Sequence, residues 1–224
     1  MVTIEQDGFE VIPGILGFAE ADRLVQDLHA AIVARTKAGS RHALRHACVS
    51  ALAEDSRLIS LAAETLGRGA FPFRATLFDK SPQSNWLVVW HQDTALPLRQ
   101  RRDHPAWGPW SVKGGVTYAH APAAALARVL ALRVHLDDSL AENGPLRVLP
   151  GTHTRGVLTD QEIRESAESL RPTECLVGKG GVVAMRPLLI HASSKSRSDT
   201  PRRVLHIEYA ESREIAAGFE LAVA

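Results

Sequence analysis

Apolar residues recur at helical spacing in the first third of the chain and at strand-like spacing in the rest. The run from Phe18 to His29 places apolar residues three and four positions apart, with acidic residues in its first turn, which predicts an amphipathic helix. A second helix is expected near Asp55 to Leu66, with Gly67 as its C-cap. We therefore expect residues 1–70 to be mainly helical and to cover one face of a sheet.

From Phe71 onward, short apolar runs alternate with turn residues, which is typical of strands. The segment Thr159–Glu162 has the pattern of a capped helix start and lies between two of these runs. Many short strands with few βαβ units favour an antiparallel double-sheet barrel, in one domain that spans residues 1–224. The expected strands are 71–78, 86–93, 129–136, 174–177, 182–185, 188–192 and 204–209.

Composition narrows the classes of protein that fit this pattern. The chain has 224 residues, 45% of them hydrophobic, and a formal net charge of +1, which argues against disorder, nucleic-acid binding and a polyanionic partner. No apolar run approaches the length of a membrane span, and the N-terminus lacks the basic and apolar regions of a signal peptide. Only two cysteines are present, Cys48 and Cys175, so we expect no disulfide framework and a cytoplasmic location.

The chemistry of the chain is concentrated in a His-x-Asp sequence. If Trp86–Asp93 is an extended strand, His91 and Asp93 project from the same face and Gln92 from the other. Two histidines and one carboxylate on one side of a metal, with the other side open, form the iron site of many oxygenases. We expect His191, at the end of an apolar run, to supply the third ligand. Zinc is a weaker alternative, because neither histidine has a neighbouring Glu that could serve as general base.

Several further motifs appear in a fixed order along the chain, and together with the His-x-Asp sequence they resemble the phytanoyl-CoA dioxygenase family. The resemblance extends from Asp7 to Tyr209. It implies a mainly β fold with flanking helices around a double-stranded β-helix (jelly-roll, cupin-like) core. It also implies Fe(II), 2-oxoglutarate as cosubstrate and O2, with ascorbate in support. The motifs are Leu77–Pro82, Asn85–Trp86, Trp90–Asp93, Leu136–Ser139, Glu142–Leu146, Pro150–His153, His191–Ser193 and Arg202–Arg203.

The family pattern assigns roles to individual positions. His91, Asp93 and His191 would be the metal ligands. The family places an Arg eleven residues after the distal His, where it pairs with the far carboxylate of 2-oxoglutarate, and this position is Arg202. The family's hydroxyl two residues after that His falls on Ser193, and strand parity independently puts Ser193 on the same face as His191.

Arg202 and Arg203 compete for the cosubstrate. The face of Arg203, Leu205, Ile207 and Tyr209 is apolar, which at first sight places Arg203 inward. In a double-sheet fold, however, an outer face covered by helices is also apolar, and the inner face of a catalytic barrel can be polar. Arg202 would lie on that polar face with Val204, His206 and Glu208, so we assign Arg202. The alternative is that both arginines only cap the strand.

The family also lines the cosubstrate pocket with a Trp downstream of His-x-Asp and a Lys well upstream. Trp107 and Trp110 compete for the first place, and although their spacing does not decide between them we assign Trp110. The Lys stays unassigned because Lys80 lies too close to His91 along the chain, and Arg74 would fit only by its chemistry. The Asp93 carboxylate excludes the halogenating branch, in which a small residue replaces it.

Residues 94–115 are basic and aromatic, and they contain a single acid. Such a segment could attract a carboxylate-bearing substrate, or it could be a solvated loop whose tryptophans pack on the barrel. The candidate substrate-binding residues are Arg99, Trp107, Tyr118 and His120.

The leading hypothesis is a dioxygenase that hydroxylates a small organic molecule, with desaturation or epoxidation as variants. The alternatives are a non-catalytic metal-binding jelly-roll protein and a metal-dependent hydrolase or isomerase. The family does not imply a coenzyme A ester, and the sequence does not indicate the oligomeric state.

Overall fold

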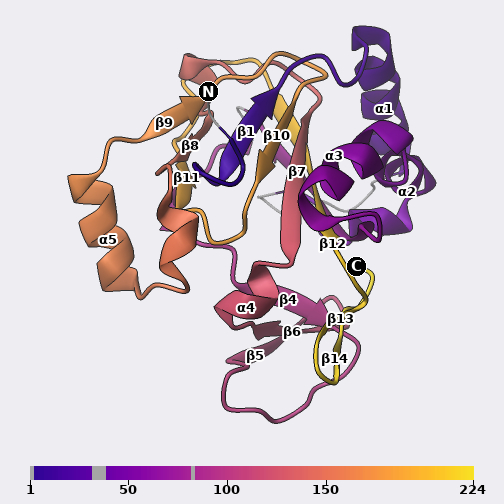
Figure 1. Cartoon of the computed structure of the whole chain (residues 1–224). Coiled ribbons are helices and arrows are strands. Elements are labelled where there is room, and N and C mark those ends of the chain that lie inside the picture. The colour runs from indigo at the N-terminus through magenta and orange to yellow at the C-terminus, as the bar shows by residue number, and fades with distance from the viewer. Residues whose placement is uncertain (1–2, 32–38, 82–83) are drawn as a thin grey trace.

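Two antiparallel sheets face each other at the centre of the molecule (Figure 1). The computed structural model describes residues 3–31, 39–81 and 84–224. Apolar side chains from both sheets form one buried cluster between them, which includes Ala131 and Met185 on one side and Val148 and Cys175 on the other. This arrangement confirms the expected double-stranded β-helix. The large sheet runs in the order β1 (Phe9–Ile12), β10 (Val182–Met185), β7 (Val129–His135), β12 (Arg202–Ala210) and β2 (Phe71–Lys80). The small sheet runs in the order β3 (Val88–His91), β11 (His191–Ser193), β8 (Leu146–Val148) and β9 (Thr173–Cys175).

Helices of the N-terminal part cover the outer face of the large sheet. The predicted helices are confirmed as α1 (Phe18–Ala31) and α3 (Ser56–Leu66), and a short α2 (Ala47–Ala53) lies between them. The Asp55 side chain caps α3 by accepting a hydrogen bond from the Arg57 backbone N–H. Figure 1 shows the three helices together on one side of the sheet. They bury an apolar face there and leave the inner face of the sheet free to carry other chemistry.

Strand parity separates these two faces on β12. Leu205, Ile207 and Tyr209 lie in the core cluster beneath the helices. The intervening residues Val204, His206 and Glu208 therefore point into the barrel, and both polar residues among them are buried. On β7 the same alternation puts Leu130, Leu132 and Val134 under the helices and turns Arg133 inward. The interior of the barrel is thus polar along β12 and around Arg133, as the sequence predicted for β12, and apolar where the cluster fills the space between the sheets.

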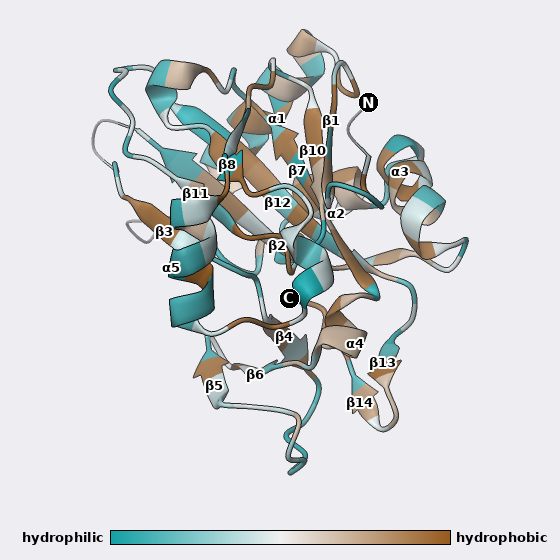
Figure 2. Cartoon of the chain, turned by 60° about the vertical axis from the view of Figure 1, so that its left-hand side comes forward, coloured by the Kyte–Doolittle hydropathy of each residue, from teal (hydrophilic) through white to brown (hydrophobic). Residues whose placement is uncertain are grey.

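Two further layers complete the molecule. One is a three-stranded sheet in the order β4 (Ala95–Leu98), β6 (Val116–His120) and β5 (Trp110–Lys113), which packs with α4 (Ala123–Leu126) and the hairpin β13 (Glu214–Ala216) and β14 (Phe219–Glu220). The other is α5 (Asp160–Ser169), whose predicted start is confirmed by a capping box between Thr159 and Glu162. Figure 2 shows α5 as a largely hydrophilic helix, in contrast to the hydrophobic strands of the large sheet. Short 3₁₀ helices span Ala43–Arg45, Ala141–Asn143 and Thr152–Arg155.

Two strand predictions are partly wrong. The expected strand 86–93 is confirmed only over Val88–His91, so Asp93 lies two residues beyond its end. The apolar run from Leu188 to Ile190 is a turn, and β11 starts only at His191. The run is apolar because it is buried, since Leu189 and Ile190 are fully enclosed by two core clusters. In the described part of the chain, none of the helices combines the length and the apolar character that crossing a membrane requires.

Candidate metal centre and adjoining cavities

Three side chains with metal-binding atoms meet in the small sheet. His91 ends β3, His191 begins β11, and the two residues are direct partners in the antiparallel register. Their ring centroids are 4.2 Å apart. The carboxylate oxygens of Asp93 lie 3.8 Å from His91 Nε2 and 3.5 Å from His191 Nε2. Among the described residues, this is the one group of three His, Cys, Asp or Glu side chains whose donor atoms all lie within 4.8 Å of one another.

Both imidazoles are oriented as metal ligands. The Nδ1 atom of His91 lies 2.8 Å from the Val89 carbonyl oxygen, and Nδ1 of His191 lies 2.9 Å from that of Leu189. A carbonyl can only accept, so each Nδ1 donates and each Nε2 keeps a free lone pair. Carbonyl groups commonly hold metal-ligating histidines in this way. Together with Asp93, the two Nε2 atoms provide the donor set of a facial metal site with open positions.

The backbone around Asp93 explains why it faces the histidines. Gln92, between the two residues, turns away and is buried, where its side-chain amide donates to the carbonyls of Leu188 and Gly156 at 2.7 and 2.9 Å. The backbone N–H of Asp93 donates to the Pro187 carbonyl at 2.9 Å. The end of the His-x-Asp segment is thereby tied to the turn that leads into His191.

The protonation states suit metal binding. Burial lowers the pKa of His191 to about 4, although the charge of Asp93 opposes this shift. Burial alone would raise the pKa of Asp93, but the facing His191 and His91 hold it well below its usual range. Near pH 7, His191 is therefore neutral and Asp93 is ionised, and these are the forms in which both side chains bind a metal.

A cavity of about 110 Å³, here called the triad cavity, is lined by these three residues and by the inner faces of β2, β7 and β12. Lys80 and Arg202 are direct partners in the β2–β12 register, and both line it. Ser193 Oγ accepts hydrogen bonds from Lys80 Nζ at 2.8 Å and from Arg202 Nη2 at 3.2 Å. Ser193 in turn donates to the Gly144 carbonyl at 2.8 Å. Two cations and a hydroxyl thus form a cradle for an anion.

Lys80 was missed by the sequence reasoning. We expected it to lie too close to His91 along the chain to reach the cosubstrate pocket, but β2 and β3 belong to opposite sheets, and both residues line the same cavity. Lys80 is almost fully buried. Burial, with the charges of Arg202 and Arg133, lowers its pKa to about 7. The signal that could have revealed it is its place at the end of β2, opposite the start of β12.

Arg202 and Arg203 lie on opposite faces of β12. Arg202 is buried in the triad cavity, where its Nε atom also donates to the Asn143 carbonyl at 3.2 Å. Arg203 points to the outer face and forms a two-point ion pair with Asp137, with Nη2 to Oδ1 at 2.6 Å and Nε to Oδ2 at 2.7 Å. Arg203 is therefore neutralised away from the triad, and Arg202 is the arginine available to a ligand there.

The structure does not bring the expected tryptophans to the triad cavity. Trp107 stacks on Phe219, with 4.2 Å between ring centroids, and Trp110 packs at the edge of the same apolar cluster. Both belong to the layer formed by residues 95–120. The aromatic residue that does line the cavity is Trp86, whose ring lies 5.4 Å from Lys80 Nζ. It comes just before the metal strand, where the sequence search did not look.

A second cavity of about 180 Å³, here called the polar chamber, shares Asp93 with the triad cavity. At its base, Arg74 forms a two-point ion pair with Glu208, and the remaining terminal nitrogen of Arg74 donates to the Ala95 carbonyl at 2.8 Å. Glu208 is almost fully buried and Arg74 is mostly buried. Exposed Arg41 and Lys113 also line the chamber. The full lining is Arg41, Arg74, Thr76, Phe78, Asp93, Lys113, Tyr118, His206 and Glu208.

Of the four expected substrate residues, only Tyr118 reaches this chamber. Its hydroxyl lies 3.0 Å from His42 Nε2. Arg99 is exposed and pairs with Glu220 at 2.8 Å, and His120 is exposed with its Nδ1 atom 2.7 Å from the Thr94 hydroxyl. Trp107 is in the apolar cluster described above. Arg74, His206 and Glu208 were not predicted as substrate residues, although the parity of β12 had placed the last two on the inner face.

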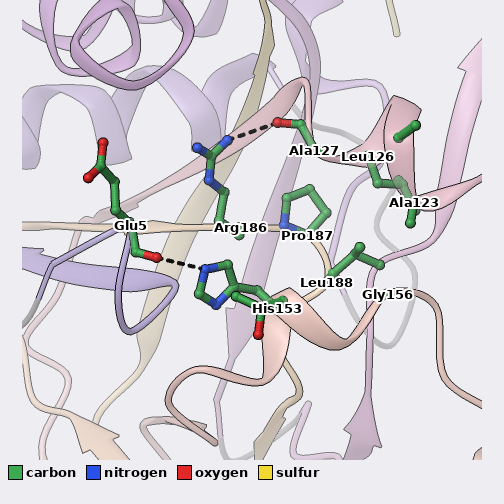
Figure 3. Close-up of a pocket in the computed structure, with 11 residues that line it drawn as sticks. Glu5, Ala123, Leu126, Ala127, His153, Gly156, Arg186, Pro187 and Leu188 are labelled. Carbon is green, nitrogen blue, oxygen red and sulfur yellow. Dashed lines mark hydrogen bonds between the residues drawn. The ribbon is translucent and has the colours of Figure 1, made fainter.

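A larger cavity, about 510 Å³, lies elsewhere (Figure 3). It lies between α4 and the turn before His191, and its lining is mostly apolar. Arg186 and His153 at one end are engaged with the carbonyls of Ala127 and Glu5, as the dashed lines in Figure 3 show. None of the three clustered donors lines it. Size alone therefore does not identify the chemical centre of this protein.

Comparison with known proteins connects this site to a family. The profile described as "Phytanoyl-CoA dioxygenase (PhyH)" matches residues 4–204. A curated relative, L-proline trans-4-hydroxylase of Streptomyces griseoviridis, is 28% identical over 178 residues, which are 68% of this chain and 59% of the relative. Phytanoyl-CoA dioxygenase domain-containing protein 1 of Mus musculus is 31% identical over 102 residues, 39% of this chain and 35% of the relative. The chain thus spans less than two thirds of the length of either relative.

A solved structure shares the fold. The crystal structure of HygX from Streptomyces hygroscopicus, with nickel and 2-oxoglutarate bound, superimposes with a TM-score of 0.66 at 17% identity. The match covers 92% of this chain and 83% of that one. At this identity the likeness concerns the fold, and the chemistry has to be argued from the residues of this chain.

Proposed function

We propose a dioxygenase function from the premise that this chain belongs to the phytanoyl-CoA dioxygenase (PhyH) family. The protein would use Fe(II), O2 and 2-oxoglutarate to hydroxylate a small organic molecule, with desaturation or epoxidation as variants. The observation that carries the proposal is the convergence of His91, Asp93 and His191 beside a cavity with an anion cradle. The location we propose is the cytoplasm, which agrees with the free thiols of Cys48 and Cys175.

The three clustered donors fit ferrous iron. His91 and His191 would bind through Nε2, which the carbonyl contacts of Nδ1 leave free, and Asp93 would bind through its carboxylate. Two imidazoles and one carboxylate on one side leave open positions for a cosubstrate and O2. When bound, the iron would supply O2 activation, with 2-oxoglutarate oxidised to succinate and CO2, one oxygen atom going to succinate and the other to the substrate.

The triad cavity fits 2-oxoglutarate. Its walls carry the basic side chains Lys80, Arg133 and Arg202, which suit a small dicarboxylate. Arg202 would bind the far carboxylate through its planar guanidinium, with Lys80 donating beside it and Ser193 holding both cations in place by accepting from them. Trp86 would supply the aromatic wall of the pocket, which is the role that the sequence analysis gave to Trp110.

The polar chamber fits the substrate, because it meets the triad cavity at Asp93 without containing the anion cradle. We propose that the substrate bears a carboxylate. Arg74 and Glu208 neutralise each other and Asp93 would bind the metal, which leaves the exposed Arg41 and Lys113 as the cations of the chamber without an anionic partner among the described residues. Burial, with the charges of Arg41 and Arg74, lowers the pKa of Lys113, as expected where cations lack a partner anion.

Replacing Arg41 and Lys113 together with glutamine is expected to raise the KM of a carboxylate substrate about tenfold and to leave kcat within about twofold. Partly exposed charge contacts contribute on the order of 1 kcal/mol each or less, and salt should reduce the effect. The measurement is steady-state kinetics at low and high ionic strength. Arg99→Gln is the matched control, since Arg99 pairs with Glu220 outside the chamber. A double variant with unchanged KM would contradict the carboxylate assignment.

The test of the function itself is a panel of small carboxylic acids incubated with the protein, Fe(II), ascorbate and 2-oxoglutarate. L-proline belongs in the panel because it is named in the hydroxylase relative. We expect succinate to form and one product to gain an oxygen atom by mass spectrometry. Leaving out either Fe(II) or 2-oxoglutarate should abolish both signals. Unaltered turnover without them would reject the proposal.

The same panel separates the two other classes considered. Metal binding without succinate over the whole panel would indicate a non-catalytic binding protein. Anaerobic turnover with zinc would indicate a hydrolase or isomerase, which does not need O2.

A further inference from the structure

Arg133 is a buried cation without a carboxylate partner. It lies on the inner face of β7, is 7% exposed and lines the triad cavity. Its Nη1 atom lies 3.1 Å from His206 Nδ1, and its guanidinium carbon lies 5.3 Å from the centre of the Phe78 ring. Its Nε atom has no hydrogen-bond partner. A buried guanidinium without an anion is costly, so an arginine placed like this indicates a ligand that supplies the negative charge.

The groups around Arg133 hold it in place without neutralising it. An arginine cannot accept a hydrogen bond, so Nη1 donates to His206 Nδ1 and the His206 proton lies on Nε2, which faces Glu208 Oε2 at 3.8 Å. Both Glu208 oxygens already accept from Arg74. The Glu208 carboxylate is therefore committed to Arg74 and does not neutralise Arg133.

The basic side chains that line the triad cavity favour a ligand with two negative charges. Its lining contains three basic side chains, Lys80, Arg133 and Arg202, and a single acid, Asp93, which the metal would use. Lys80 and Arg202 share Ser193 and form one end. Arg133 instead pairs with His206 in the β7–β12 register, four residues further along β12 than Arg202. Burial, with the charge of Arg133 as a further cause, lowers the pKa of both Lys80 and Arg202, and burial lowers that of Arg133 although the charge of Asp93 opposes it. Arg133 therefore lies within electrostatic range of both ends of the cavity.

We propose that Arg133 binds the carboxylate next to the keto group of 2-oxoglutarate, an inference that rests on the proposed function. A 2-oxo acid chelates a metal through its keto oxygen and one carboxylate oxygen, and the second oxygen of that carboxylate remains free to accept a hydrogen bond. Arg133 offers its charge and its terminal Nη2–H donors for it, since Nη1 is used by His206 and the enclosed Nε is out of reach of the cavity. Arg133 would thus be a positioning residue for the metal end of the cosubstrate, as Arg202 is for the far end.

Two 2-oxo acids, 2-oxoglutarate and 2-oxopentanoate, distinguish binding at the metal end from binding at the far carboxylate. 2-Oxopentanoate has the keto acid group but lacks the far carboxylate of 2-oxoglutarate. Each would be titrated by calorimetry, without O2, into Mn(II)-loaded wild type, Arg133→Met and Arg202→Met. We expect Arg133→Met to weaken both ligands by the same factor, about 10- to 100-fold, as for loss of a charged hydrogen bond. Arg202→Met should weaken only 2-oxoglutarate. Arg133→Gln, which keeps a donor for His206, should lie between wild type and Arg133→Met.

Three results would overturn the inference. One is unchanged 2-oxoglutarate affinity in Arg133→Met, which would show that Arg133 does not bind this cosubstrate. Another is a loss confined to 2-oxoglutarate, which would place Arg133 at the far carboxylate. The third is a parallel loss of Mn(II) affinity, which would show an effect on the metal site itself. If wild type binds neither 2-oxo acid, the proposed function fails as well, so the two failures can be told apart.

Discussion

His191→Ala is expected to lower the affinity for a divalent metal by at least about 100-fold and to abolish turnover. Even residues that only support a metal ligand typically cost 10–100-fold in affinity when replaced, so the loss of a ligand should cost more. His191 is 4% exposed, and its free Nε2 lies 3.5 Å from an Asp93 oxygen. No nearby side chain in the described part of the chain completes an equivalent set. The measurement is calorimetric titration with Mn(II) or Co(II).

His91→Ala should behave like His191→Ala, because the two residues face each other in the strand register and contribute equivalent nitrogen atoms. The matched control is His120→Ala, since His120 is exposed and contacts Thr94 outside the triad cavity. It should keep the metal affinity of wild type. The assignment fails if His191→Ala retains wild-type affinity, or if His120→Ala loses it to the same extent.

Arg202→Met is expected to weaken 2-oxoglutarate binding by about 30-fold or more. Truncating one partner of a buried, hydrogen-bonded charge pair typically costs 2–5 kcal/mol. Arg202 is 4% exposed and donates to Ser193 and Asn143, so it is already oriented before any ligand arrives. Arg203→Met is the control, because Arg203 is occupied by Asp137 on the other face of β12. Comparable losses in both variants would reject the assignment of Arg202 to the cosubstrate.

The pH dependence of the same titration reports on Lys80. Burial, Arg202 and Arg133 lower its pKa to about 7, so Lys80 loses its proton as the pH rises through that value. The affinity of wild type for 2-oxoglutarate should therefore fall as the pH rises above 7. Lys80→Met should bind more weakly than wild type at pH 6 and should lose this pH dependence. An identical pH profile in the variant would contradict the role of Lys80.

Folding stability provides a second readout with the opposite sign. The pKa of Lys80 is lower in the folded chain than its ordinary value, so between about pH 7 and the ordinary lysine pKa the unfolded chain binds more protons. Lys80 alone therefore makes the ligand-free protein more stable as the pH rises through that window. Thermal unfolding of wild type and Lys80→Met across this range should show the contribution in wild type only.

The sequence by itself determined the fold class and the most specific part of the site. His91, Asp93 and His191, which the structure brings together, could be named in advance because each lies in or beside a short strand. Arg202 and Ser193 were implied by the spacing of the family that the chain resembles, and strand parity supported Ser193. The alternation along β12 also indicated which arginine is inside, since the apolar residues between the polar ones had to pack against helices. Local periodicity carries this information because it depends only on neighbouring residues.

The tertiary structure alone decided which distant side chains share a cavity. Lys80, Trp86 and Arg133 line the triad cavity because of the register between β2, β12 and β7 and the facing of two sheets. None of these pairings has a signature in the local pattern. Trp107 and Trp110 lie elsewhere because residues 95–120 fold into a separate sheet with its own apolar cluster. Register and the packing of one sheet on another depend on contacts between residues far apart in the chain, and for that reason the charges of both cavities became visible only in the folded molecule.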